Sequence, residues 1–261
     1  MEIPSARNIR ILNIVFEYNH CDMINKAPAI NTDFEDLYLE VRRQEKRVYT
    51  DEQLRMLPDI DPLNIHAAEW KIRKRSCMRL LLYLFKKHKS LRILEVGCGN
   101  GWLSSKLANI PGSLVTGLDI NQVEINQACR VFDKENLDFV YDTFNEDTFQ
   151  DEKFDIIVFA ASVQYFPSVK DILEQALSQL NPDGEVHIMD THFYKPEEIN
   201  KAHARTLNYY NSLGYPQMAD NYFHHSIDEL AGLKHHILLN PDSILSMMSK
   251  KGPFHWITVN P

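Results

Sequence analysis

A glycine-rich stretch carries the clearest chemical signal in the sequence. Residues 93–102 read Ile-Leu-Glu-Val-Gly-Cys-Gly-Asn-Gly-Trp, and an acid, Glu95, stands two positions before the first glycine. Gly97 and Gly99 have no Cβ atom, so the backbone can turn tightly there and a ligand can approach it closely. The helix expected to begin at Trp102 offers unpaired backbone N–H groups beside this turn.

A carboxylate follows at a spacing that suits a nucleoside. Asp119 ends the next expected strand, 18 residues after Gly101, where a carboxylate can accept hydrogen bonds from two ribose hydroxyls. The dinucleotide fingerprint Gly-x-Gly-x-x-Gly needs a third glycine for close helix–strand packing, and Trp102 occupies that position. We therefore predict a nucleoside-containing ligand other than a dinucleotide, at the C-terminal edge of a parallel sheet.

Alternating strands and helices from Leu91 onward are expected to position these residues. Strands are predicted at 92–96, 114–119, 137–141, 154–160, 185–190, 235–239 and 255–259. Helices are predicted at 102–108, from the N-cap Asn121, at 170–180, at 196–213, near 226–233 and at 241–250. Right-handed crossovers return successive strands to one sheet. The predicted fold is therefore α/β, a doubly wound, mostly parallel seven-stranded sheet with helices on both faces and an N-terminal helical extension.

The domain organisation follows from a break near two prolines. Residues 1–65 are expected to form the extension of helices and loops, which ends near Pro58 and Pro62. The main domain is predicted at 66–261 and opens with a helix over 66–88, and residues 192–234 are predicted to be an insertion that shapes the substrate site. Residues 71–92 carry nine Lys and Arg and no acid. This basic segment is either a solvated helix face or a surface that recognises an anionic substrate.

Composition excludes several classes of protein. The chain has 261 residues, a formal charge of −8 and 44% hydrophobic residues, which is ordinary for a folded globular protein. The acidic balance argues against nucleic-acid binding, and no stretch suits a membrane span or a secretory signal, so no membrane partner is expected. Four scattered cysteines, Cys21, Cys77, Cys98 and Cys129, are expected to be reduced thiols, so we predict a cytoplasmic protein.

The acidic Gly-x-Gly-x-Gly stretch resembles motif I of the class I S-adenosylmethionine-dependent methyltransferases. The resemblance continues in order through Leu118-Asp119-Ile120, Tyr141-Asp142-Thr143, Phe154-Asp-Ile-Ile-Val, Gln164-Tyr165-Phe166 and the turn Leu180-Asn-Pro-Asp-Gly-Glu-Val. It implies a Rossmann-like fold, S-adenosylmethionine as cofactor, S-adenosylhomocysteine as product, and methyl transfer to a hydroxyl, amine or carbon of a small molecule, an anionic acceptor being one option.

The resemblance also implies roles for individual residues. The backbone from Gly97 through Cys98 and Gly99 to Gly101 would cradle the methionine part of the cofactor, and Glu95 would orient this loop or meet the amino group. The remaining cofactor contacts would be Asp119 at the ribose, Ile120 at the adenine face, Asp142 and Thr143 at the adenine edge, and Ala160 near the sulfonium.

Residues after the fourth and fifth strands are candidates for catalysis, because doubly wound sheets place their substrates there. These are Tyr165, His192 and Tyr194, and His192 is the favoured base because an imidazole titrates near neutral pH. Trp70 and Arg73 are candidate substrate-binding residues. The adjacent pairs His224-His225 and His235-His236 predict no metal site, because neighbouring residues on a strand point to opposite faces.

Three alternatives remain open at this stage. A protein or RNA methyltransferase would share the cofactor loop, although no RNA-binding module is apparent and Ala160-Ala-Ser-Val stands where planar-amine methylators carry their signature. A nicotinamide-dependent oxidoreductase is disfavoured by Trp102. A non-catalytic cofactor-binding protein would keep the loop but lack an open acceptor site.

Overall fold

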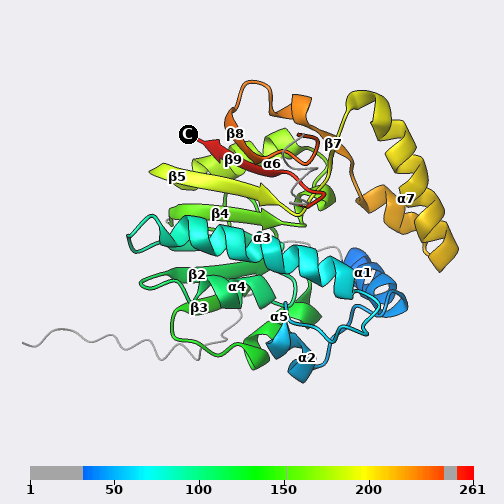
Figure 1. The fold of residues 1–261 in the computed structure, drawn as a ribbon, viewed down its shortest axis with the longest axis horizontal. Helices are drawn as coiled ribbons and strands as arrows, with labels where there is room; N and C mark the ends of the chain where they lie inside the picture. The colour runs from blue at the N-terminus through cyan, green and yellow to red at the C-terminus, as the bar shows by residue number, and fades with distance from the viewer. Residues whose placement is uncertain (1–31, 151, 244–251) are drawn as a thin grey trace, which may run out of the picture.

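Within the described residues the main sheet has seven strands, of which six run in one direction and one runs in the opposite direction. The structure, a computed structural model, describes residues 32–150, 152–243 and 252–261. The strand order is β3-β2-β1-β4-β5-β9-β8 (Figure 1). The strands of this sheet are β1 (Arg92–Val96), β2 (Leu114–Asp119), β3 (Leu137–Tyr141), β4 (Phe154–Ala160), β5 (Leu180–Met189), β8 (Lys234–Leu239) and β9 (Trp256–Asn260). β9 is antiparallel to both β5 and β8, whereas the other pairs are parallel. The predicted fold class is confirmed.

The direction of winding reverses at β1. This strand pairs with β2 on one side and with β4 on the other, so the chain builds the sheet outward in both directions from it. In such sheets the loops at the carboxyl ends of the two diverging strands separate, which leaves a crevice for a ligand. The glycine-rich stretch follows β1 directly and therefore lies at this crevice.

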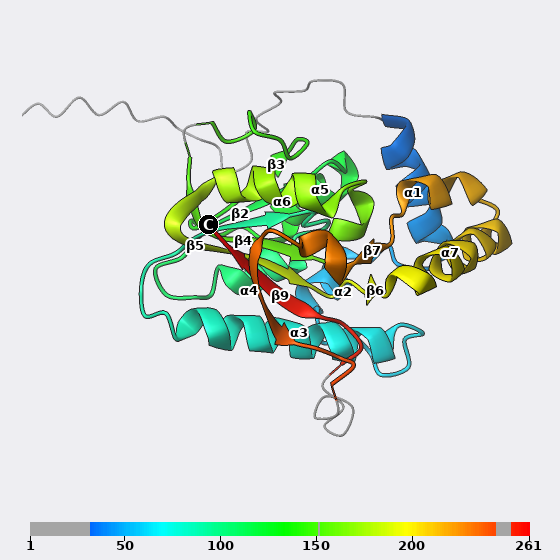
Figure 2. The same cartoon turned by 90° about the horizontal axis from the view of Figure 1, so that it is seen from above.

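Helices cover both faces of the sheet, as predicted. α3 (Ala67–Phe85), α4 (Trp102–Leu107) and α5 (Gln122–Val131) share one core with the side chains on one face of the strands, including Ile93 and Val158. α6 (Val169–Ser178) packs against the other face, where Leu94 and Ile157 lie. Figure 2 shows α3 and α6 on opposite sides of the sheet. Strands with both faces buried in this way need continuous apolar sequence, which β4 has.

The first N-terminal helix packs against the segment that follows β5. That segment contains β6 (Phe193–Tyr194), η2 (Pro196–Glu198), α7 (Ile199–Leu213), η3 (Pro216–Asn221), β7 (His225–Ser226) and η4 (Ile227–Leu230). α1 (Thr32–Gln44) places Val41 in a small core with Tyr210 of α7 and Met218 of η3, and both views show α1 and α7 side by side (Figures 1 and 2). α2 (Asp51–Met56) follows, with Thr50 and Gln53 forming a capping box.

A buried histidine connects α3 to the sheet. The Trp256 indole donates a hydrogen bond to Nδ1 of His187 (3.0 Å), and Nε2 of His187 lies 3.2 Å from a Glu185 carboxylate oxygen. Because an indole N–H can only donate, Nδ1 is the acceptor and Nε2 carries the hydrogen of the neutral ring. Lys87, just beyond α3, forms an ion pair with the same glutamate at 2.8 Å. Burial lowers the pKa of His187, which keeps the ring neutral.

Several sequence-based expectations need correction. The turn expected at Asn181–Gly184 belongs to β5, because a shift in register against β4 accommodates these residues within the strand. Cys77 and Cys98 are free, buried thiols, but Cys129 is disulfide-bonded.

Part of the predicted chain lies outside the described residues. Most of the helix expected at 241–250 lies outside the described residues, as do Cys21 and residues 1–31 of the N-terminal extension. None of the helices in the described ranges combines the length and the apolar character that crossing a membrane requires.

Leu80 offers a test of how much α3 contributes to stability. Its side chain is 0% exposed and packs into the core beneath α3, whereas Leu82, two residues on, is 56% exposed. Leu80→Ala is expected to lower the free energy of unfolding by about 2–5 kcal/mol, since it removes buried apolar contacts and leaves a cavity. Leu82→Ala is the matched control and is expected to change it by less than about 0.5 kcal/mol. Equal losses in urea unfolding would contradict this packing of α3.

Candidate functional site

The glycines after β1 fit against neighbouring elements. Gly97 and Gly101 both have φ of +74°, in the left-handed region. A Cβ atom at Gly97 would lie 2.5 Å from Cβ of Ser162, and one at Gly101 would lie 2.5 Å from the ring of Phe139. Any larger residue would therefore force the loop away from β4 or β3. Close packing within the protein therefore requires glycine at both positions. This reason is separate from the close approach of a ligand, which the sequence suggested.

Asp119 holds the two loops that meet at the crevice. Its carboxylate accepts a hydrogen bond from the backbone N–H of Gly99 (2.7 Å) and another from that of Asn121 (2.8 Å). The first bond fixes the loop after β1, and the second fixes the start of α5. Burial raises the pKa of Asp119 to about 6, although the two N–H donors act in the opposite direction.

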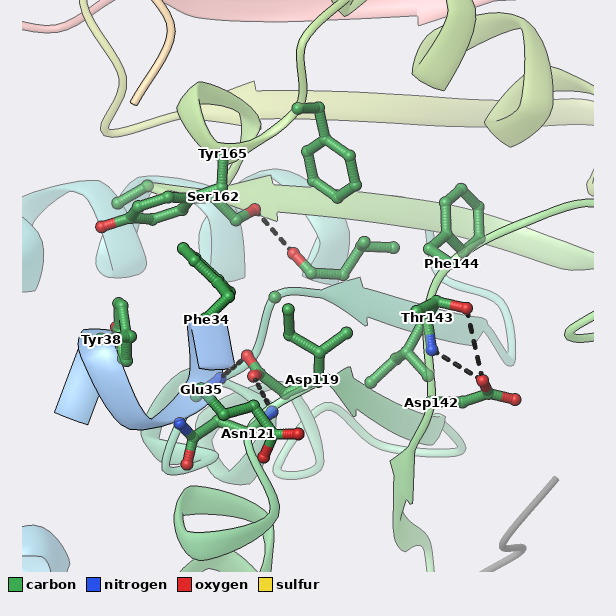
Figure 3. A pocket seen from close by; sticks show the side chains of 17 residues that line it. Phe34, Glu35, Tyr38, Asp119, Asn121, Asp142, Thr143, Phe144, Ser162 and Tyr165 are labelled. Carbon is green, nitrogen blue, oxygen red and sulfur yellow. Dashed lines mark hydrogen bonds between the residues drawn. The ribbon is translucent and has the colours of Figure 1, made fainter. Parts of the chain in front are cut away.

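A cavity of about 240 Å³ opens at the carboxyl ends of β1 to β4 (Figure 3). Six residues predicted for the cofactor line it: Gly97, Gly99, Asp119, Ile120, Asp142 and Thr143. Figure 3 shows Asp119 near the middle, the α1 side chains at one end, and Thr143 with Phe144 at the other. Asp142 is buried, and one of its oxygens accepts a hydrogen bond from the N–H of Thr143 at 2.7 Å, so part of its acceptor capacity is used by its own turn.

A second cavity of about 100 Å³ adjoins the first and shares Tyr38, Gly97, Gly99 and Ala161 with it. It brings together three further predicted cofactor residues, Glu95, Cys98 and Ala160, and the two substrate-binding candidates, Trp70 and Arg73. Gly101 is not among the residues that line either cavity. This cavity is polar: its lining also includes Arg42, Arg47, Glu69 and Glu124. Charges of both signs therefore face one small volume next to the glycine-rich loop.

The arginines of the second cavity are held by ion pairs. Arg47 donates two hydrogen bonds to Glu69 (2.9 and 2.6 Å), and Arg73 donates a third to the same carboxylate (2.9 Å). These contacts lower the pKa of Glu69 to about 2 despite its burial. Glu45 lies 2.9 Å from Arg42 and 3.2 Å from Arg47, so three guanidinium groups face two carboxylates, and the remaining positive charge favours an anionic group there.

The carboxylates nearest the loop behave differently. Glu95 is buried at the end of β1 and accepts a hydrogen bond from the Ser104 hydroxyl of α4, and burial raises its pKa to about 8. Burial and the charge of Asp119 raise the pKa of Glu124 to about 7. The loop is therefore surrounded by carboxyl groups that lack the cationic partners Glu69 has.

α1 supplies a wall that the sequence reasoning did not foresee. Glu35 accepts hydrogen bonds from the Tyr141 hydroxyl (2.6 Å) and the Gln122 N–H (3.1 Å), and thereby fastens α1 over the larger cavity. Arg42 donates to the Tyr165 hydroxyl (3.1 Å) and lies 4.7 Å from the centre of the Tyr38 ring. Phe34, Tyr38 and Arg42 recur every four residues, a spacing that places them on one face of a helix. This four-residue spacing is the feature of the sequence from which the inward face of α1 could have been predicted.

The three candidate catalytic residues separate in the structure. Tyr165 lines the larger cavity. His192 is exposed, its ring centre lies 4.3 Å from that of Tyr194, and neither residue lines either of the two cavities.

His225, one of the paired histidines, is buried against Glu229. Within the described ranges no group of three or more His, Cys, Asp or Glu side chains is arranged to hold a metal ion.

Comparisons with known proteins identify the family. A family model described as a methyltransferase domain matches residues 70–250. Since this match covers more than half of the chain, the chain belongs to the methyltransferase-domain family, as the resemblance of its motifs predicted.

Curated relatives match over shorter stretches. A sterol 24-C-methyltransferase of Gibberella zeae is 31% identical over 98 residues, which are 36% of this chain and 26% of that protein. Malonyl-[acyl-carrier protein] O-methyltransferase 2 of Ilyobacter polytropus is 29% identical over 134 residues, 49% of this chain and 51% of that protein. The chain thus spans between a quarter and a half of the length of these relatives.

Solved structures share the fold across nearly the whole chain. Magnesium protoporphyrin IX methyltransferase from Synechocystis PCC 6803 has a TM-score of 0.57 at 14% identity and covers 88% of this chain and 99% of its own. The plantazolicin methyltransferase BpumL has a TM-score of 0.53 at 15% identity and covers 88% of this chain and 98% of its own. At such low identity the likeness establishes the fold alone.

The raised pKa of Glu95 predicts a pH dependence of stability. Burial raises this pKa from 4.5 to about 8, so between these values the folded state keeps a proton that the unfolded state has lost. The contribution is fully present below pH 4.5 and is lost as the pH rises through 8. Glu95 should therefore lower the free energy of unfolding by up to about 1.4 kcal/mol per pH unit between pH 5 and 8. Glu95→Gln removes this contribution, so its Tm should fall less steeply over the same pH range.

The matched control for this prediction is Glu135→Gln, at an exposed glutamate outside the site. It should leave the pH dependence of Tm as it is in the unmodified protein. If Glu95→Gln also left the slope unchanged, the buried carboxyl would not be carrying the extra proton.

Proposed function

We propose that this chain transfers a methyl group from S-adenosylmethionine to a small molecule. The observation that carries the proposal is the pair of adjoining cavities that meet at Gly97 and Gly99. One is larger and mostly lined by apolar and aromatic side chains, which suits a nucleoside. The other is small and charged, which suits the amino-acid end of the same ligand. Membership of the methyltransferase-domain family supports this assignment.

The residues present fit the two ends of the cofactor. In the larger cavity Ile120 and Phe144 offer apolar contact for an adenine, Asp142 and Thr143 offer polar edges, and Asp119 is a hydrogen-bond acceptor for the ribose. In the smaller cavity the cations around Glu69 suit the carboxylate of the methionine part. Glu95 and Glu124 suit its ammonium group, and Gly97 to Gly101 would supply the backbone beneath it.

The bound cofactor would supply a methyl group on a sulfonium with a good leaving group. The chain's own task is then alignment and removal of water, and alignment alone is worth about 7–11 kcal/mol in favourable model systems. α1 covers the cavity from outside through Phe34 and Tyr38. Ala160 is small and lines the polar cavity, which leaves room for an acceptor beside the reacting methyl. Tyr165 is the predicted catalytic residue that lies in this region.

Relatives and charge both bear on the class of acceptor. The names of the curated relatives refer to a sterol and to a malonyl group on a carrier protein, which supports a small-molecule acceptor. Arg42 also lines the smaller cavity and is not one of the cations assigned to the cofactor carboxylate, so an anionic acceptor stays part of the proposal. Trp102 is buried and its ring lies 5.2 Å from that of Trp70, so a nicotinamide dinucleotide is disfavoured on geometry as well as on sequence. The cytoplasmic location stays a prediction.

Calorimetric titration tests the cofactor directly. We expect the full chain to bind S-adenosylmethionine and S-adenosylhomocysteine and to bind NADH far more weakly, because Trp102 fills the space that a dinucleotide fold leaves open. Asp119→Asn should weaken binding of both sulfur ligands by more than about tenfold, since it removes the charge and one of the two acceptors at the ribose and loop. Asp138→Asn, at an exposed aspartate on the neighbouring strand β3, is the control.

Tighter binding of NADH, or no binding of either sulfur ligand, would overturn the proposed function. An unchanged Kd for Asp119→Asn would instead remove Asp119 from the ribose while leaving the function intact. Tm is measured for each variant, so that loss of the fold is not mistaken for loss of an interaction.

Turnover distinguishes the catalytic candidates. With a panel of hydroxyl, amine and carboxylate acceptors and S-adenosylhomocysteine formation as the readout, Tyr165→Phe should lower kcat by about tenfold or more on the acceptor that reacts. The reason is that Tyr165 lines the larger cavity and its hydroxyl is held by Arg42, which lines the smaller one. His192→Ala should have a smaller effect, because the ring is exposed outside both cavities. The reverse ranking would return the catalytic role to His192.

A further inference from the structure

The outer face of α3 carries a stripe of exposed apolar side chains. Met78, Leu82 and Phe85 are 49%, 56% and 55% exposed, and their spacing of four and three residues places them in one row along the helix. The fold does not use this row, because α3 contacts the sheet through its opposite face, which contains Leu80 and Leu84. Figure 2 shows α3 lying along the outside of the sheet.

The stripe is bordered by positive charge. Lys71, Lys74 and Arg75 are exposed on the same face, and Lys86 follows at the end of the helix. No acid occurs between Lys71 and Arg92, although Lys74 reaches back to pair with Asp59.

Four further cations of the basic segment have roles elsewhere in the fold. Lys87, Lys89 and Arg92 pair with acids of the sheet and its loops, and Arg73 faces the smaller cavity. The outer face of α3 is thus basic and apolar in a chain whose overall charge is −8.

We propose that this outer face of α3, defined by Lys71, Arg75, Met78, Leu82, Phe85 and Lys86, docks on an anionic lipid surface. A helix with an apolar row between lysines can lie in the plane of a bilayer, with its apolar side chains among the acyl chains and its cations at the phosphates. Long basic side chains bring their charge to the headgroups while their methylenes stay beside apolar neighbours. Peripheral contact of this kind needs no membrane span.

Charge complementarity favours a lipid surface over a second copy of the chain. A symmetric dimer through α3 would place the basic face of one protomer against the basic face of the other, which costs free energy and leaves no acid to compensate. An anionic bilayer offers opposite charge along the whole row. It would also fix the position of the reaction site, because Trp70 and Arg73 on the inner side of the same helix line the smaller cavity.

Co-sedimentation of the full chain with lipid vesicles tests the proposal. We expect binding to vesicles of equal parts phosphatidylglycerol and phosphatidylcholine, at least about tenfold tighter than to phosphatidylcholine alone, and weaker at high salt. The combined variant Met78→Ser, Leu82→Ser, Phe85→Ser and, separately, the pair Lys71→Gln, Lys86→Gln should each reduce this binding by about tenfold or more. Val123→Ser, at a 55% exposed apolar side chain on α5, is the matched control and should bind as the unmodified chain does.

Circular dichroism and Tm establish that each variant is folded. Equal binding to neutral and anionic vesicles, or binding that both sets of substitutions leave unchanged, would overturn the proposal. So would a concentration-dependent dimer that the apolar variant abolishes in the absence of any vesicle binding, since the face would then be an interface between copies. Binding to polyglutamate but not to vesicles would assign the face to an acidic protein partner instead.

Discussion

One carboxylate sets the geometry on which the rest of the site depends. Asp119 receives the N–H of Gly99 from one side and that of Asn121 from the other, so a single side chain fixes the loop after β1 relative to the start of α5. Both cavities are bounded by the glycine-rich loop. Their shapes are therefore consequences of this pair of hydrogen bonds and of the close packing that Gly97 makes with Ser162.

The electrostatics of the two cavities follow from how each charge is paired. Where one acid lies between two guanidinium groups, as Glu69 does, its charge is stabilised and the surroundings stay positive. Where carboxyl groups face the loop without cations of their own, as with Glu95 and Glu124, burial favours the protonated form. A zwitterionic amino acid carries an ammonium group that can pair with the carboxyl groups of Glu95 and Glu124. It also carries a carboxylate that can pair with the guanidinium groups around Glu69. The charged cavity is therefore complementary to an amino acid.

Much of this site could be predicted from local sequence, because its core lies in one strand–loop–helix unit. The bounds of β1 to β4 and six of the residues that line the larger cavity follow from short-range periodicity, glycine placement and the acid at the end of β2. The contribution of α1 could not be predicted in this way. Glu35 meets Tyr141 and Arg42 meets Tyr165 across more than a hundred residues of chain, and such contacts depend on tertiary packing. For the same reason His192, favoured for its chemistry, lies outside the cavities.

The wall that α1 provides has a consequence for how this protein can diversify. The cavity is enclosed on one side by sheet loops, whose side chains are constrained by the packing of the core. On the other side it is enclosed by a helix that is held by polar contacts of Glu35 and Arg42 and by the packing of Val41 outside the sheet. Side chains of α1 that face inward, such as Phe34 and Tyr38, can change without disturbing the strands. Selection for a new acceptor could therefore act on one helix while the machinery beneath it is inherited unchanged.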